Sequence, residues 1–264
     1  LETGNGYTIQ QLVEIGLFTN NDIHALFTTI SDIRLLSTTT YGSQNVSELI
    51  SLGYSRDEIH KAGFPIWLPN GLPVTGSSQG GNAGHSTATN LYGNIIALGA
   101  PLHTSINGTN VGQVQVYAYN NDTWTQMGQN IEGETDGDNL GTSIALSIDG
   151  TILVIGTPFS IGTNGDDSGR VQVYEYGMMN DEMSWIMRGN AIDGENVGDE
   201  SGRSVSMSNN GNIIAIGSPL NSDNGVGSGH TRVYELINNS WTQRGNTIVG
   251  EDAGDFAGGS VSLN

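Results

Sequence analysis

Two stretches of nine residues decide the fold: GNIIALGAP at 93–101 and GNIIAIGSP at 211–219. A related run, ILVIGTP at 152–158, stands between them, so the chain carries the element three times. Recurrence of one element along a chain is the signature of an array of similar structural units. The copies therefore indicate an architectural repeat and not a catalytic motif.

Each unit contains the same four predicted strands. In the unit at 201–255 they are SGRSVSMS at 201–208, NIIAIGSP at 212–219, HTRVYEL at 230–236 and SWTQRGNTI at 240–248. Apolar and polar residues alternate with period two, while Asn, Asp and Gly fall between the runs. The second run is apolar throughout, which is typical of a strand buried on both faces. Four antiparallel strands per unit predict one blade of a β-propeller.

The repeat places three blades and part of a fourth in this sequence. Their predicted bounds are 80–138, 139–199 and 200–255, with the first strand of a fourth blade at 256–264. Three blades do not close a ring of the usual four to eight or so. We expect the chain to be a segment of a longer product; the alternative is that neighbouring subunits complete the sheet by strand exchange.

The residues of the repeat carry a family resemblance. The order Gly-x-Ser-Val (202–205), then Gly-Ala-Pro (99–101), then Gly-x-Val-x-Val-Tyr (112–117) resembles the FG-GAP repeat of integrin-α-type β-propellers. The Phe-Gly half differs, since Leu140-Gly141 and its equivalents lack the aromatic residue. Phrases such as WTQxGNxIxGE are similar to divergent propeller repeats in surface and virion-associated proteins of microbes, algae and large DNA viruses. The resemblance implies a surface protein.

Calcium is the cofactor that this resemblance implies, but the position is not matched. The family's Asp-x-Asp-x-Asp-Gly loop lies between the first two strands of a blade, where this chain has only short turns such as SIDGT at 147–151. Acidic residues instead follow each repeat tryptophan, beside glycines, and could supply oxygen ligands to Ca²⁺. The alternative is that they cap turns through backbone hydrogen bonds. The candidates are Glu134, Asp136, Asp138, Glu195, Asp199, Glu251, Asp252 and Asp255.

The first 79 residues differ in kind from the repeat. YTIQQLVEIG at 7–16, VSELISLG at 46–53 and YSRDEIHKAG at 54–63 combine helix-capping Ser or Thr with a closing Gly. They resemble the decapeptide-like helical repeats found beside such propellers. We therefore predict a small helical domain at 1–64 and a turn-rich Pro/Gly linker at 65–79.

Composition excludes several classes of partner. The chain has 27 acidic and 8 basic residues, a net charge of −19, 39 glycines and no cysteine. A surface of this charge repels phosphate backbones, so nucleic acid is not expected as a partner. No run reaches the roughly 18 apolar residues of a membrane span. Without cysteine there is neither a disulfide nor a thiolate nucleophile.

Catalytic signals are weak. Gly-x-Ser triplets, as at 202–204, superficially resemble a nucleophile elbow, but that motif needs a strand-turn-helix context and one unique serine. The histidines are scattered without metal-ligand spacing. A propeller enzyme acting on polysaccharide would need two carboxylates special to one blade, and Asp166-Asp167 is the pair that meets this condition. Trp124, Trp185 and Trp241 could stack on sugars, but recurring tryptophans are more typical of packing between blades.

Four N-x-Ser/Thr sequons predict glycan sites if the chain passes through a eukaryotic secretory route: Asn45, Asn107, Asn121 and Asn238. Together these patterns predict a non-enzymatic extracellular, cell-surface or virion-surface protein used for adhesion or structure. Its loops would bind other proteins or glycans, with self-assembly possible. The alternative is a propeller-type polysaccharide hydrolase or lyase.

Overall fold

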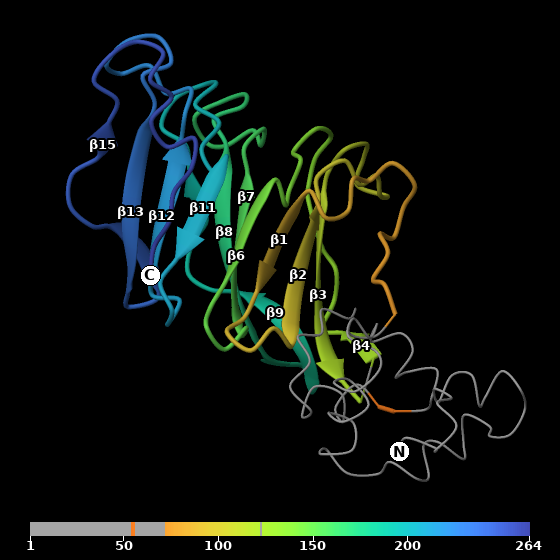
Figure 1. Cartoon of the computed structure of the whole chain (residues 1–264). Coiled ribbons are helices and arrows are strands. Elements are labelled where there is room, and N and C mark those ends of the chain that lie inside the picture. The colour runs from red at the N-terminus through yellow and green to blue at the C-terminus, as the bar shows by residue number, and fades with distance from the viewer. Residues whose placement is uncertain (1–53, 56–71, 122) are drawn as a thin grey trace, which may run out of the picture. The chain divides into compact units, whose positions relative to one another are not determined.

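The structure, a computed structural model of the 264-residue chain, describes residues 54–55, 72–121 and 123–264 (Figure 1). The chain divides into two compact units, Leu1–Pro69 and Asn70–Asn264. Every described strand belongs to the second unit, and no helix occurs among the described residues. Almost all of the predicted helical domain at 1–64, and the start of the predicted linker, lie outside the described residues. The described residues accordingly contain no helix that is long and apolar enough to cross a membrane.

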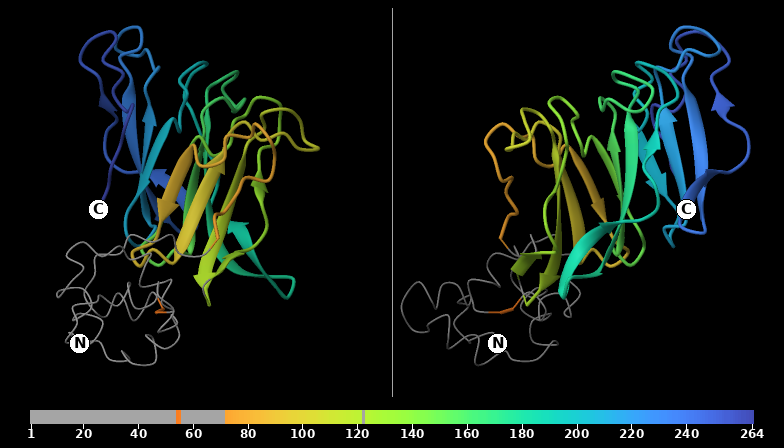
Figure 2. Two further views of the ribbon diagram at one scale, coloured as in Figure 1. Left: turned by 45° about the vertical axis from the view of Figure 1, so that its right-hand side comes forward. Right: turned by 180° about the vertical axis from the view of Figure 1, so that it is seen from behind.

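The described strands form three antiparallel sheets of one design (Figures 1 and 2). Sheet 1 contains β1 (Ser86–Thr89), β2 (Ile95–Ala100), β3 (Gln113–Asn120), β4 (Thr123–Gln126) and β5 (Ile131–Glu132). Sheet 2 contains β6 (Ser143–Leu146), β7 (Ile152–Thr157), β8 (Arg170–Met179), β9 (Glu182–Met187) and β10 (Ile192–Asp193). Sheet 3 contains β11 (Ser204–Met207), β12 (Ile213–Ser218), β13 (His230–Ile237), β14 (Ser240–Gln243) and β15 (Ile248–Val249). The prediction of repeated four-stranded antiparallel units is confirmed.

The fourth strand of each unit is broken in two, which the sequence reading missed. In sheet 1, β4 and β5 both pair with β3, at 117–120 and at 113–114 respectively. The predicted continuous strand at 240–248 is likewise divided into β14 and β15. The break contains a glycine with a left-handed backbone, and φ is +75° at Gly128, +79° at Gly189 and +77° at Gly245. A residue in that conformation cannot continue a ladder.

Hydrophobic side chains pack between neighbouring sheets. The middle strand β7 is buried along its whole length. Leu153 and Ile155 join a cluster with Val114 and Val116 of sheet 1, whereas the alternate residues of β7 join a cluster with Ile214 and other residues of sheet 3. Successive side chains of β7 therefore point alternately into the two hydrophobic cores on either side of sheet 2, as the apolar run predicts. The sheets stand side by side, and β6 of sheet 2 contacts β1 of sheet 1 and β11 of sheet 3 (Figure 2).

The repeated Gly-x-Pro and Gly-x-Ser motifs meet where the backbones of neighbouring sheets come into close contact. A Cβ atom at Gly156 would overlap the backbone oxygen of Gly202 in the next sheet. Ser143 Oγ donates a hydrogen bond to the same oxygen at 2.7 Å. Gly99 and Ser86 make the equivalent contacts with Gly141. The glycine two residues before each proline and the Gly-x-Ser triplet thus form one contact that repeats between neighbouring sheets.

Tryptophan forms the second contact between sheets. The Trp185 side chain is 2% exposed and its Nε1 donates to the Met127 oxygen of the preceding sheet at 2.7 Å. Trp241 Nε1 donates to the Arg188 oxygen at 2.8 Å in the same way. Both indole rings lie against the strand-breaking glycine, with Cδ1 2.9 Å from where a Cβ would stand at Gly128 or Gly189. Packing between units, predicted for the tryptophans, is confirmed for these two.

In sheet 3, the surface that corresponds to the one packed against the tryptophan of the next sheet in sheets 1 and 2 is exposed. A Cβ at Gly245 would meet no atom within 4 Å. Ile248 is 62% exposed, whereas the equivalent Ile131 is 5% exposed beneath sheet 2. The segment 256–264 repeats the serine contact between sheets, since Ser204 Oγ donates a hydrogen bond to the Gly258 oxygen at 2.8 Å. It does not form the predicted strand, since Ala257 makes only an isolated bridge to Gly229 and no residue of the segment joins a ladder.

Candidate functional site

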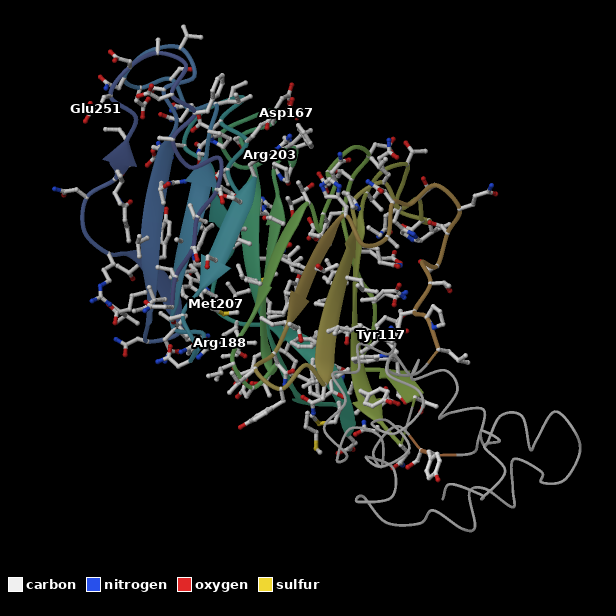
Figure 3. The ribbon with its side chains drawn as sticks, viewed as in Figure 1. Tyr117, Asp167, Arg188, Arg203, Met207 and Glu251 are labelled. Carbon is white, nitrogen blue, oxygen red and sulfur yellow. The ribbon has the colours of Figure 1, made fainter. Side chains whose placement is uncertain are left out.

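Six loop segments gather at one end of the three sheets. They are 101–112, 158–169 and 219–229, which follow β2, β7 and β12, and 133–142, 194–203 and 250–259, which follow β5, β10 and β15. We call this end the loop face. Strand direction explains the segregation, because the second and last strands of each sheet run toward this end and the other turns lie at the opposite end. Figure 3 shows Asp167, Arg203 and Glu251 at the loop face and Arg188 toward the other end.

The loop face is held in place by hydrogen bonds that repeat from sheet to sheet. An asparagine at the tip of each longer loop donates through Nδ2 to a glycine oxygen in the other loop of its sheet. These pairs are Asn107 to Gly133 at 3.1 Å, Asn164 to Gly194 at 2.7 Å and Asn224 to Gly250 at 2.8 Å. The loops are therefore built as paired units and present their remaining side chains from a fixed frame.

Charge on the loop face is strongly negative. The six segments contain twelve acidic residues and a single arginine, Arg203. Nine of the carboxylates are exposed: Glu134, Asp136, Asp166, Asp167, Glu195, Asp223, Glu251, Asp252 and Asp255. Apolar side chains project among them, with Ile106 99% exposed and Val226 82% exposed. The face thus combines a negative field with exposed apolar tips.

Three of the predicted calcium ligands cap turns. Asp138 is buried, and its Oδ2 accepts the backbone N–H groups of Glu134 at 3.1 Å and Thr135 at 2.9 Å. Asp199 accepts the N–H of Asn196 at 3.0 Å, and Asp255 that of Asp252 at 2.9 Å. The capping role that was the alternative to calcium is confirmed at these three positions.

The other five predicted ligands, Glu134, Asp136, Glu195, Glu251 and Asp252, have exposed side chains. They lie on three loops of three different sheets. Asp136 Oδ1 accepts the Thr109 N–H at 2.6 Å. Among the described residues, Glu195 alone of the eight candidates belongs to a group of three close metal-ligating side chains, with Asp223 and His230. Calcium binding stays a prediction.

That group was not found from the sequence, where His230 looked like an isolated histidine. One ligand atom from each of Glu195, Asp223 and His230 lies within 4.8 Å of the others. Burial and the neighbouring Arg232 lower the pKa of His230, so its ring is neutral at neutral pH. The signal that could have found the group is the alignment of His230 with Gln113 and Arg170, the first residues of the matching strands.

In sheet 2 the matching position holds an ion pair. Arg170 Nε donates to Asp193 Oδ1 at 2.7 Å, and Arg170 Nη1 lies 3.8 Å from Glu134 Oε2 of the preceding sheet. Burial alone would raise the pKa of Asp193, but hydrogen bonds from Arg170 and Thr163 lower it below its ordinary value. A cavity of about 10 Å³, room for one water, lies beside Arg170 between sheets 1 and 2.

The remaining predicted sites are dispersed. Asn121 and Asn238 are exposed in the turns at the end opposite the loop face, with φ of +48° and +49°. Asn107 is on the loop face, and Asn45 lies outside the described residues. Asp166 and Asp167 are both exposed, in a loop whose backbone oxygens accept hydrogen bonds from 198 and 200.

Comparisons with known proteins show no family. No family model matches the chain, and no curated protein matches it. Hydrazine synthase from Kuenenia stuttgartiensis is similar in structure over 62% of this chain and 36% of its own, at 14% identity and a TM-score of 0.36. Sqt1 of Saccharomyces cerevisiae is similar over 61% of this chain and 34% of its own, at 10% identity and a TM-score of 0.35. The periplasmic gluconolactonase PpgL of Pseudomonas aeruginosa is similar over 62% of this chain and 56% of its own, at 13% identity and a TM-score of 0.32. The chain thus spans less than two thirds of the length of these proteins.

Proposed function

We propose that the three sheets are blades of a β-propeller in a non-enzymatic surface protein, extracellular or on a virion, and that the loop face binds other proteins. One observation carries this proposal: nine exposed carboxylates and several exposed apolar tips lie on one face, on loops fixed by repeated hydrogen bonds. Since a propeller fold does not choose its partner, the chemistry of the loop face does.

A protein with basic side chains suits this face better than a glycan. Apolar tips such as Ile106 offer contact area, while the carboxylates steer and orient a cationic partner. Sugar binding usually needs an exposed aromatic face, but Trp185 and Trp241 are buried between sheets. The aromatic side chains of the six segments are two phenylalanines. Phe256 is 52% exposed, and the ring centroid of Phe159 lies 5.7 Å from Cζ of Arg203. The loop face therefore presents no indole or phenol ring on which a sugar could stack.

The surface location and a role in assembly rest on other features. The resemblance of the WTQxGNxIxGE phrases supports an extracellular or virion setting, and the exposed sequons Asn121 and Asn238 are compatible with it. The bare lateral surface of sheet 3, with Ile248 exposed, supports association with a further sheet of the same kind. A strand-rich repeat buries its apolar face only against a neighbour.

The test is selection of defined binders to the full chain. A displayed peptide library and a glycan array are each screened against the immobilised protein. We compare a loop-face variant, Ile106→Asn with Val226→Asn, with a matched variant at the opposite end, Leu91→Asn with Tyr92→Asn, since all four side chains are exposed. The selected peptides should be rich in Lys and Arg and should bind at least about ten-fold more weakly to the loop-face variant alone.

Salt provides a second reading, since screened carboxylates should lose affinity as ionic strength rises. Binders that depend on Leu91 and Tyr92, or binding of glycans without peptides, would contradict a protein-binding loop face. The enzymatic alternative would replace the proposal if the chain degraded a polysaccharide and Asp166→Asn abolished that activity.

A further inference from the structure

The first residue of the third strand occupies an equivalent place in each sheet but meets a different neighbour. Gln113 pairs in register with Glu132, and its Nε2 donates to Glu132 Oε1 at 3.1 Å. Arg170 pairs with Asp193 and donates to it at 2.7 Å. In sheet 3 the same register brings His230 opposite Val249, an aliphatic residue. The polar partner supplied in sheets 1 and 2 is therefore absent within sheet 3.

His230 is left buried with both ring nitrogens unused. Its side chain is 0% exposed, and neither Nδ1 nor Nε2 makes a hydrogen bond to a described residue. Glu195 Oε2 lies 4.0 Å from Nδ1, beyond hydrogen-bond reach. Buried polar groups are nearly always satisfied, so an imidazole in this state calls for a ligand.

Two carboxylates converge on the ring from different sheets. Glu195 comes from the loop after β10 in sheet 2, and Asp223 comes from the loop before β13 in sheet 3. One ligand atom from each lies within 4.8 Å of the other and of His230. The imidazole is buried, while both carboxylates are exposed.

Neighbouring side chains contact both carboxylates and orient them. Arg232 Nη1 lies 3.1 Å from Oε1 of Glu195, which leaves Oε2 toward the histidine. Asn196 Nδ2 donates to Asp223 Oδ1 at 3.3 Å, and the Asp223 N–H donates to Asn221 Oδ1 at 3.1 Å. Supporting contacts of this kind hold ligands in place around metal ions.

We propose that Glu195, Asp223 and His230 bind a divalent transition-metal ion, best matched by Zn²⁺, which links sheets 2 and 3. Imidazole with two carboxylates suits Zn²⁺ and related ions, whereas Ca²⁺ takes six or more oxygen ligands. Bonds of about 2.0–2.2 Å require ligand atoms about 3.5 Å apart. Movement of the two exposed carboxylates by about 1 Å achieves this.

The local charge favours a cation. Two ligand carboxylates and the buried carboxylate of Asp199 are opposed by the single guanidinium of Arg232. At the equivalent position between sheets 1 and 2, a cation of the chain already neutralises the carboxylates, because Arg170 lies between Asp193 and Glu134. At the junction between sheets 2 and 3, Arg232 of sheet 3 lies 3.1 Å from Oε1 of Glu195, and a metal ion would bind the other oxygen, Oε2, beside His230.

The test uses the full chain, stripped with EDTA and dialysed, and titrated with zinc chloride in a calorimeter. One saturable site is expected, and Asp223→Asn, Glu195→Gln and His230→Gln should each weaken it by roughly 100-fold. The matched control is Glu251→Gln, which alters the equivalent residue of the loop after β15 and should leave the affinity unchanged. Zn²⁺ should raise the melting temperature of the wild type and of Glu251→Gln, but not that of Asp223→Asn.

His230 is buried, so His230→Gln could fail for reasons of folding; the two exposed carboxylate variants keep the proposal falsifiable. X-ray absorption of the zinc-loaded protein should show one imidazole and oxygen ligands. No saturable zinc binding, or binding unchanged in both Asp223→Asn and Glu195→Gln, would overturn the proposal. Calcium chloride binding at the same three residues as tightly as zinc would overturn the choice of metal.

Discussion

Adding one methyl group at the glycine that breaks the fourth strand should test whether tryptophan locks the sheets together. Gly189 and Gly245 are equivalent residues with nearly equal φ, +79° and +77°. The Cβ of Gly189→Ala would stand 2.9 Å from Trp241 Cδ1 and 3.0 Å from its Nε1, whereas that of Gly245→Ala would meet nothing within 4 Å. Comparing the two variants therefore separates the cost of overpacking against Trp241 from the cost of the strained backbone, which both share.

The expected magnitudes follow from this difference. Both substitutions place alanine in the left-handed region, which costs about 1–2 kcal/mol. Gly189→Ala must in addition displace a buried indole, and overpacking of that kind costs about 1–3 kcal/mol more. With a slope of about 2–3 kcal/mol per molar urea, the midpoint for Gly189→Ala should lie roughly 0.3–1.5 M below that for Gly245→Ala.

The assay is urea unfolding of the two variants and the wild type, followed by circular dichroism and tryptophan fluorescence. A third variant, Trp241→Leu, makes room for the methyl group and should reduce the extra cost of Gly189→Ala when the two are combined. Equal destabilisation by Gly189→Ala and Gly245→Ala would refute the packing role of Trp241, whatever the absolute values.

Three further outcomes are expected. Ser143→Ala removes the hydrogen bond to the next sheet and should lower the free energy of unfolding by about 0.5–1.5 kcal/mol, whereas Ser260→Ala, at the exposed equivalent position, should change it by less than about 0.5 kcal/mol in a urea titration. The pKa of Asp193 is lowered in the folded state, so its contribution to stability is complete above the unfolded value of about 3.9 and is lost as pH falls through the folded pKa; Asp193→Asn should remove this acid-dependent part from stability measured against pH. In a eukaryotic secretory host, mass spectrometry should find glycan on the exposed turn residue Asn121 and less on Asn107, whose side-chain nitrogen is hydrogen-bonded to Gly133.

Most of the fold could be predicted because it depends on properties that recur along the chain. The alternation of apolar residues sets four strands per unit, and the apolar run ILVIGT becomes β7, buried on both faces between two sheets. The division of the fourth strand could not be seen in this way. WTQRGNTI reads as one strand, but it breaks at Gly245, where φ is +77° although no atom lies within 4 Å of the Cβ position, so the break comes from the backbone conformation and not from a tryptophan of a neighbouring sheet.

The candidate site depends on where one unit departs from the others, and such departures acquire meaning only through register. Val249 in place of Asp193 is an unremarkable change in a strand of mixed residues, and His230 in place of Arg170 is one more scattered histidine. Pairing of β13 with β15 puts these two changes opposite each other, so that together they remove a polar partner from a buried ring. The loop before β13 then supplies Asp223, which belongs to no repeated phrase. In a repeat protein, a site special to one junction is thus to be sought where paired substitutions break the pattern that the other units share.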